Sequence, residues 1–266
     1  MRLTTLGGSA AGPNPGQGCS GYLVESGGTR LVLDLGPGTL PVLRLHADFR
    51  RLDGVILSHL HVDHMLDVIA LRYALAYNPV RPEGPIPLWL PPGGFTFLDA
   101  IARAFMPAGD RDAFFSVFAL AEYDPDAALT AGDIQVRFHP TVHYIPCWAM
   151  RVSNGIDGDL FYTADTGPAA TLVPFARGSR IIIAEGTKQP GDREPFATRG
   201  HLTPEEAGRL ASEVQAEVLV LTHLWAENDP FRAVAQAGAA FRGQVVLATP
   251  GRQVTWAAGL SRDSGD

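Results

Sequence analysis

A short segment after the apolar run Val55–Leu57 places three imidazoles and one carboxylate within six positions, in the order Ser58-His59-Leu60-His61-Val62-Asp63-His64. A strand that ends near Leu57 directs His59 and His61 to one side. Asp63 and His64 then turn away at the start of the following helix, where a carboxylate is favourable. Imidazole and carboxylate together are typical ligands of zinc, with manganese or iron as alternatives. Because these ligands cannot all reach one ion, the segment predicts two adjacent divalent metal ions and a metal-dependent hydrolase; a histidine-rich turn without metal is the alternative.

The charge balance of the chain limits the classes of molecule that are expected to bind it. The chain has 28 acidic and 21 basic residues, a net charge of −7, and we find no Lys/Arg cluster of the kind that follows a nucleic-acid backbone. Nucleic acid is therefore allowed as a partner but not favoured. Lys188 is the only lysine, so nearly all positive charge is guanidinium, which suits phosphate or carboxylate recognition or reflects coding bias.

The cysteines and the hydropathy pattern bear on the compartment. Cys19 and Cys147 are too few for a disulfide framework, which fits a reducing compartment. No sustained apolar segment opens the chain, and none is long enough to cross a bilayer. We therefore expect a cytoplasmic protein with no membrane partner.

The pattern along the chain predicts a single domain over residues 1–266, with two groups of strands and helices between them. Residues 79–131 are expected to form an insertion or lid region, and residues 261–266 a flexible tail. The expected strands are Leu3–Leu6, Gly21–Glu25, Arg30–Leu35, Gly54–Leu57, Ile134–Phe138, Trp148–Val152, Leu160–Tyr162, Ile181–Ala184, Val218–Leu221, Val245–Leu247 and Val254–Trp256. The expected helices are Asp63–Tyr77, Thr96–Phe105, Arg111–Phe115, Pro204–Val214 and Pro230–Phe241.

Further candidate ligands follow the ends of later strands. His143 and Asp165 lie in loops beside strand candidates, and His223 directly follows a buried-looking strand. His139 competes with His143, but a residue inside a strand is less suited to ligation than one in a loop. Asp165 could bridge two cations about 3.5–4 Å apart, the spacing of two-metal hydrolases.

The motif His-x-His-x-Asp-His followed by single His, Asp and His residues resembles the metallo-β-lactamase superfamily. Four further segments are similar to the part of that superfamily that contains ribonuclease Z and related cyclic-nucleotide phosphodiesterases: Gly7-Gly8-Ser9-Ala10-Ala11, Asp34-Leu35-Gly36, Ala184-Glu185-Gly186-Thr187 and Gly200-His201-Leu202-Thr203. The resemblance covers most of the chain and implies an α/β fold, the αββα sandwich of two mixed β-sheets flanked by helices. It also implies that one ion is bound by His59, His61 and His143 and the other by Asp63, His64 and His223, with Asp165 between them.

Three residues are candidates for roles in catalysis or in support of the ligands. The resemblance implies that His201 acts near the leaving group, and the alternative is a histidine that only begins a helix. Glu185 could orient His201 or relay its proton, or could be a solvated acid at a strand end. Asp34 could support a metal-binding histidine through the imidazole N–H, or could cap a turn before Gly36.

These assignments predict hydrolysis of a phosphodiester by a metal-bridging hydroxide, with Asp63 orienting or deprotonating the water and His201 protonating the leaving oxygen. In ribonuclease Z enzymes a basic arm that grips transfer RNA lies between the equivalents of His143 and Asp165, but here only 22 positions (165 − 143) separate them. A small or cyclic nucleotide is therefore the expected substrate. A tRNA 3′-processing endonuclease, a thioester or lactone hydrolase, and a metal-containing binding protein without turnover are the alternatives, and the resemblance allows a homodimer.

Overall fold

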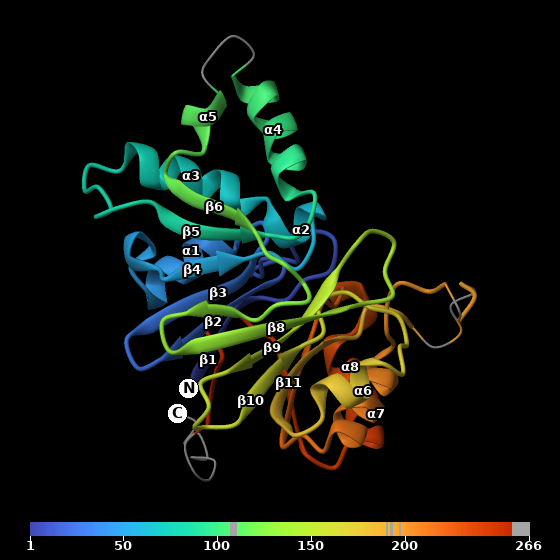
Figure 1. The fold of residues 1–266 in the computed structure, drawn as a ribbon. Coiled ribbons are helices and arrows are strands. Elements are labelled where there is room, and N and C mark those ends of the chain that lie inside the picture. Colours follow the sequence, from blue (N-terminus) through green and yellow to red (C-terminus); the bar gives the residue numbers. More distant parts are fainter. Residues whose placement is uncertain (107–110, 190, 192–193, 197, 257–266) are drawn as a thin grey trace.

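The computed structural model describes residues 1–106, 111–189, 191, 194–196 and 198–256. These residues form two seven-stranded sheets that face each other, with helices on the outer side of each sheet (Figure 1). The expected αββα sandwich is confirmed. The flexible tail expected at 261–266 lies outside the described residues.

The first sheet has the strand order β14-β1-β2-β3-β4-β5-β6. It is antiparallel from β14 to β3 and parallel from β3 to β6. Its strands are β1 (Arg2–Gly7), β2 (Gly21–Ser26), β3 (Thr29–Leu35), β4 (Gly54–Ile56), β5 (Ile86–Leu90), β6 (Phe118–Glu122) and β14 (Gln253–Thr255). The helical elements that accompany it are α1 (Thr39–His46), the 3-10 turn η1 (Phe49–Arg51), α2 (Val62–Met65), α3 (Asp67–Tyr77), α4 (Gly94–Phe105) and α5 (Arg111–Phe114).

The second sheet has the order β13-β12-β11-β10-β9-β8-β7 and the same division into an antiparallel and a parallel half. Its strands are β7 (Leu129–Ala131), β8 (Ile134–Pro140), β9 (Trp148–Ser153), β10 (Asp159–Tyr162), β11 (Ser179–Glu185), β12 (Val218–Thr222) and β13 (Gln244–Leu247). The helical elements are α6 (Leu172–Ala176), α7 (Pro204–Val214), the 3-10 turn η2 (Ala226–Asn228) and α8 (Pro230–Ala240).

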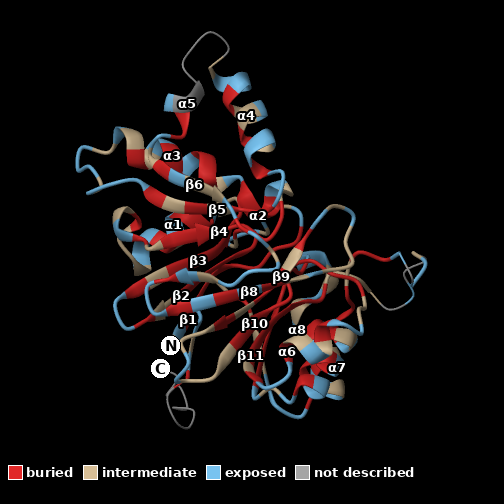
Figure 2. Cartoon of the chain, viewed as in Figure 1, coloured by how far each residue is buried: buried red, intermediate tan, exposed pale blue. Residues whose placement is uncertain are grey.

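Three apolar layers hold the sandwich together, and the buried residues follow the strands through its middle (Figure 2). Between the sheets, Leu33 of β3 and Met150 of β9 belong to one fully buried cluster. The alternate residue Val32 instead joins Leu43 of α1 in the layer outside the first sheet. Because successive side chains of a strand point to opposite faces, each sheet is buried on both faces.

Local sequence signals explain why the bounds of helix α7 were predicted correctly. Helix α7 begins and ends where predicted, because Thr203 accepts a hydrogen bond from the Glu206 backbone while the Glu206 side chain accepts one from the Thr203 backbone. Pro204 occupies the first turn, where its missing N–H costs nothing. This capping box fixes the start of the helix that follows Gly200-His201.

One prediction about the middle of the chain is wrong. The helix predicted over Asp63–Tyr77 is two helices, because Ile69 N donates to Leu66 O across a three-residue turn and offsets α3 from α2. The region expected as an insertion or lid, residues 79–131, contains strands that were not predicted: β5 and β6 extend the first sheet in parallel register, and β7 pairs with β8 in the second. These strands were missed because the segment is rich in proline.

The helices of the described residues are all too short or too polar to cross a lipid bilayer.

Candidate metal centre

The loops that follow several strands converge at one edge of the sandwich. The loop after β4 carries His59 and His61, and the loop between β8 and β9 carries His143. Asp165 follows β10, and His223 follows β12. The carboxyl ends of parallel strands meet at the same sheet edge, which is where α/β proteins place their ligands.

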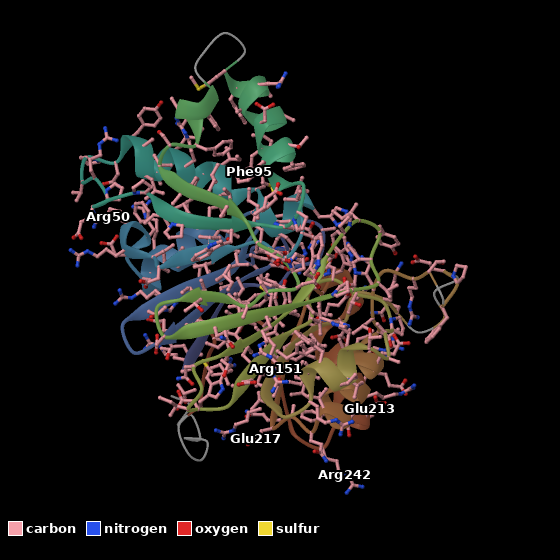
Figure 3. All side chains as sticks on the ribbon, viewed as in Figure 1. Arg50, Phe95, Arg151, Glu213, Glu217 and Arg242 are labelled. Carbon is pink, nitrogen blue, oxygen red and sulfur yellow. The ribbon has the colours of Figure 1, made fainter. Side chains whose placement is uncertain are left out.

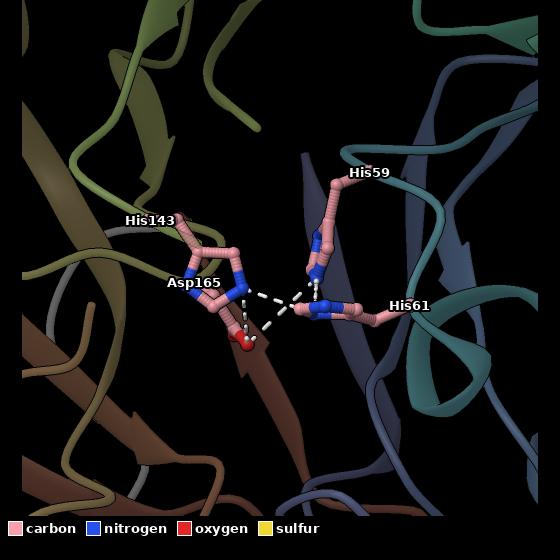
Figure 4. A group of neighbouring side chains, drawn as sticks. All are labelled: His59, His61, His143 and Asp165. Carbon is pink, nitrogen blue, oxygen red and sulfur yellow. Dashed lines mark hydrogen bonds and ion pairs between the residues drawn. The ribbon is translucent and has the colours of Figure 1, made fainter. Parts of the chain in front are cut away.

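One group of side chains consists of His59, His61, His143 and Asp165, whose ligand atoms all lie within 4.8 Å of one another. Figure 4 shows His59 and His61 on one side of the group, facing His143 and Asp165 on the other. The Nδ1 of His61 lies 3.1 Å from His59 Nε2 and 3.0 Å from His143 Nε2. Asp165 Oδ2 is 3.8 Å from the Nε2 atoms of both His59 and His143.

A second group consists of Asp63, His64, Asp165 and His223, and all four residues are buried. His223 Nε2 lies 3.0 Å from Asp63 Oδ2 and 3.3 Å from His64 Nε2. Asp165 belongs to this group too, with Oδ1 at 3.2 Å from His64 Nε2 and Oδ2 at 3.5 Å from His223 Nε2. The carboxylate of Asp165 therefore lies between the two groups.

The donor set fits divalent cations. Imidazole nitrogens that are not protonated repel one another when they converge at 3.0–3.3 Å, unless a cation lies between them. Tetrahedral zinc with bonds of about 2.0–2.1 Å sets nitrogen ligands roughly 3.3 Å apart. Asp34, Asp63, Asp165 and Glu185 are all nearly inaccessible to solvent, and four buried carboxylates require positive charge nearby.

A buried network supports His64 and His59 from behind. Asp34 Oδ2 accepts hydrogen bonds from His64 Nδ1 at 2.8 Å, from the Ser58 hydroxyl at 2.7 Å and from the Tyr162 hydroxyl at 2.7 Å. The Ser58 hydroxyl in turn lies 2.9 Å from His59 Nδ1. With Nδ1 of each ring occupied in this way, Nε2 of His59 and of His64 faces the centre as an acceptor. Asp34 therefore supports His64 by accepting a hydrogen bond from its Nδ1, one of the two roles considered for Asp34 from the sequence.

Glu185 supports the other side of the centre. Its Oε1 lies 2.9 Å from His201 Nδ1 and accepts a hydrogen bond from Thr166 N at 2.8 Å. Its Oε2 accepts a hydrogen bond from the Thr187 hydroxyl at 2.6 Å, and the Thr187 oxygen lies 2.6 Å from His223 Nδ1. One carboxylate thus contacts His201 directly and positions His223 through Thr187.

The centre perturbs the pKa of its own groups. Burial, and then the neighbouring His64, lower the pKa of His59 well below its usual value. Burial would also lower the pKa of His64, but Asp165 and Asp34 outweigh it and raise that pKa well above the usual range. For His201, burial is outweighed by the Glu185 carboxylate, which raises the pKa to about 9.

The structure brings together all seven residues that the sequence singled out as ligands, and it places His201 and Glu185 beside them. The His201 ring stacks on His223 with centroids 5.5 Å apart and meets His143 edge-on at 5.0 Å. His139 lies on β8 against Phe175, outside both groups, as expected for a structural histidine. His46 ends α1, also outside both groups.

Sequence reasoning missed Ser58, Tyr162 and Thr187, which support the histidines without being ligand candidates. It also missed Ala11, whose backbone N–H donates to Asp63 Oδ2 at 2.9 Å. Thr187 could have been found, because it lies two positions after Glu185 at the end of a strand. Tyr162 and Ala11 carried no signal, since their roles depend on contacts across more than 50 positions of the chain.

The chain matches a family model described as a beta-lactamase superfamily domain over residues 18–224. It is 32% identical over 253 residues to a probable metallo-hydrolase, YhfI, of Bacillus subtilis, covering 94% of this chain and 98% of that protein. The crystal structure of YhfI superimposes with a TM-score of 0.81 at 29% identity, covering 95% of this chain and 98% of that one.

Two more distant structures share the fold. The short form of human tRNase Z has a TM-score of 0.73 at 20% identity and covers 96% of this chain and 99% of its own. A diphosphatase of the PhnP family has a TM-score of 0.74 at 16% identity and covers 96% of this chain and 97% of its own.

Proposed function

This chain belongs to the beta-lactamase superfamily as a metal-dependent hydrolase, and we propose that it holds two divalent ions, most simply zinc, and cleaves a small phosphodiester such as a cyclic nucleotide. The proposal depends on the shared carboxylate of Asp165, which has ligand atoms in both groups. A site for one ion would not need a common carboxylate. His59, His61 and His143 would hold one ion, and Asp63, His64 and His223 the other.

The protein's own groups account for the movement of protons. When bound, divalent ions would supply Lewis acidity, which acidifies water and offsets negative charge on a phosphoryl oxygen. Asp63 is held by a hydrogen bond from Ala11 N, so that its carboxylate can orient the attacking water and accept its proton. His201 is held at Nδ1 by Glu185, which leaves Nε2 to donate a proton to the leaving oxygen.

Two features support a small substrate. Strands β9 and β10 are joined by only five residues, 154–158, so no arm extends from the chain between His143 and Asp165. The net charge of −7 does not favour a long polyanion, whereas a small phosphodiester carries one negative charge. One protein that shares the fold is named a diphosphatase of the PhnP family.

Cleavage of tRNA 3′ ends is the second candidate. Relatives named ribonuclease Z favour this candidate. One of them, from Ignicoccus hospitalis, is 24% identical over 288 residues, and the match covers 90% of that protein. A thioester or lactone hydrolase would use the same donor set on a carbonyl carbon.

A substrate panel on protein of measured metal content tests the proposal. Bis(p-nitrophenyl) phosphate and cyclic AMP should be hydrolysed, and a chelator should abolish turnover. His143→Asn should lose metal and turnover, while His139→Asn, four positions away on β8, should keep both. Cleavage of precursor tRNA or of a lactone, without cleavage of the small diesters, would contradict the substrate class. Absence of stoichiometric metal in wild-type protein would contradict the centre itself.

A further inference from the structure

Away from the metal centre, a hollow of about 620 Å³ is lined by five arginines. It lies where β1, β2 and β3 meet the end of α1, the turn η1 and the loop before β5. Figure 3 labels one of these arginines, Arg50, at the edge of the molecule beside α1. Arg30 lines the hollow near the start of β3, and Asp34, which supports His64, lies near the end of that strand. Four positions of an extended strand separate the two residues by roughly 13 Å.

The hollow is positive in an acidic chain. Its lining contains five arginines against three carboxylates, an excess of two positive charges (5 − 3), whereas the whole chain carries −7. His46 also lines it. A concave surface of one sign concentrates the field and attracts ions of the opposite charge. The ligand expected here is therefore an anion.

Three of the arginines are already neutralised. Arg2 contacts Glu25 at 2.7 Å, and Arg50 forms two 2.8 Å hydrogen bonds with the two oxygens of Asp48. Arg51 contacts Glu83 at 2.9 Å.

Arg30 and Arg81 make up the surplus. Glu25 lies between Arg2 and Arg30 in the strand register, but its second oxygen is 3.9 Å from Arg30 Nε, beyond hydrogen-bond distance. Asp53 contacts the backbone N–H of Arg30 and not its guanidinium. Arg81 has no ion pair or hydrogen bond with any of the described residues. Two guanidinium groups without a carboxylate at hydrogen-bond distance thus line one hollow.

We propose that this hollow is a binding site for a nucleotide-sized phosphomonoester that carries two negative charges. Guanidinium is planar and binds phosphate oxygens in pairs, so two arginines that lack a hydrogen-bonded carboxylate match a dianion better than a monoanion. A volume of about 620 Å³ exceeds that of a phosphate ion and falls in the range of small-molecule sites, so the hollow has room for a nucleotide. The site is independent of the proposed hydrolysis, although cleavage of a phosphodiester would release a ligand of this class.

Calorimetric titration of the metal-loaded protein with adenosine 5′-monophosphate tests the site. Wild-type protein should bind the nucleotide saturably at physiological salt. Cyclic AMP, with one charge, should bind this site more weakly, and adenosine should not bind it. Inorganic phosphate alone should bind more weakly than the nucleotide. Equal affinity for the two would show that the hollow binds only a phosphate ion and would contradict the proposal of a nucleotide-sized ligand.

Matched variants locate the binding. The double variant R30Q/R81Q should lower affinity about tenfold or more, as expected for loss of charge-assisted hydrogen bonds. Glu25→Gln should raise affinity, because it removes the carboxylate beside Arg30; this opposite effect cannot be caused by misfolding. Arg209→Gln, an exposed arginine on α7 paired with Glu205, should change nothing. His143→Asn should retain the binding even though its metal centre is damaged. Binding that survives in R30Q/R81Q but disappears in His143→Asn would assign the nucleotide to the metal centre and overturn this proposal.

Discussion

The two ligand groups that share Asp165 differ in how the protein holds them. In the second group, His64 is anchored by the buried carboxylate of Asp34, and His223 by Thr187 and Glu185. In the first group, His59 reaches Asp34 only through the Ser58 hydroxyl, and His143 Nδ1 donates to a backbone carbonyl, that of Gly200, at 2.9 Å. His61 Nε2 has no hydrogen-bond partner among the described residues, and His61 is only partly buried, whereas the side chain of His143 is inaccessible to solvent.

This difference in support indicates that the two groups bind their ions with different affinity. Carboxylates behind an imidazole raise its basicity and fix its orientation, so the second group should bind its ion more tightly. The first group is more open to solvent, so a substrate can reach its ion and that ion should exchange more readily. We expect a chelator to remove the two ions in two steps, and the four predictions below test this ranking.

The largest effect is expected for Asp165→Asn, because Asp165 is the residue common to both groups. Without its charge, neither ion should be retained fully, and turnover should fall by on the order of 10³-fold, equivalent to about 4 kcal/mol of activation barrier. Metal analysis together with a diester assay measures both effects. Asp159→Asn is the control, because Asp159 begins β10, the strand that Asp165 follows, but is paired with Arg151 away from the centre. Two full equivalents of metal in Asp165→Asn would show that the groups do not depend on a common ligand.

His201→Ala should come next, because His201 contacts a ring of each group without being assigned to either. Loss of a general acid slows turnover by about 10²–10⁴-fold, and metal content should stay at the wild-type level. His46→Ala, at the end of α1, controls for the removal of an imidazole. If metal is lost along with activity, His201 is a ligand, in agreement with its proximity to Glu185 and His223.

A smaller effect is expected for Asp34→Asn, which weakens the support of His64. Loss of such a partner weakens metal affinity by about 10–100-fold. The loss should fall mainly on the more tightly bound ion, because Asp34 contacts His64 directly but reaches His59 only through the Ser58 hydroxyl. Competition with a chromophoric chelator resolves which ion is affected. Asp133→Asn, an exposed carboxylate bonded to Ser26, should leave both affinities unchanged. If the variant lost affinity only for the more loosely bound ion, the ranking of the two groups would be reversed.

The smallest effect is expected for Thr187→Val, which preserves shape and removes the hydroxyl between His223 and Glu185. Affinity for the second ion should fall by about tenfold, at the lower end of the range for indirect support. Thr187→Ser keeps the hydroxyl and should restore wild-type affinity. Equal behaviour of the two variants would mean that the hydroxyl does not position His223.

The sequence predicted the ligands better than it predicted their support. His59, His61, Asp63 and His64 share one segment, and strand ends located His143 and His223, because the donors must lie in loops at one sheet edge. The parallel strand β5 escaped prediction because Pro79, Pro82, Pro85 and Pro87 interrupt the pattern around it. Tyr162 could not be assigned to Asp34, since 128 positions separate them and only the packing of the two sheets brings them together.

The pairing of β14 with β1 has a consequence for synthesis of the protein. Six strands of the first sheet have been translated by Glu122, but β14 begins only at Gln253. While the ribosome makes the intervening 130 residues, the outer edge of β1 has no native partner and can template pairing with another nascent chain. A chain truncated before Gln253 should therefore aggregate during expression although every residue of the metal centre is present, and co-translational chaperones should bind it for longer than they bind the full-length chain.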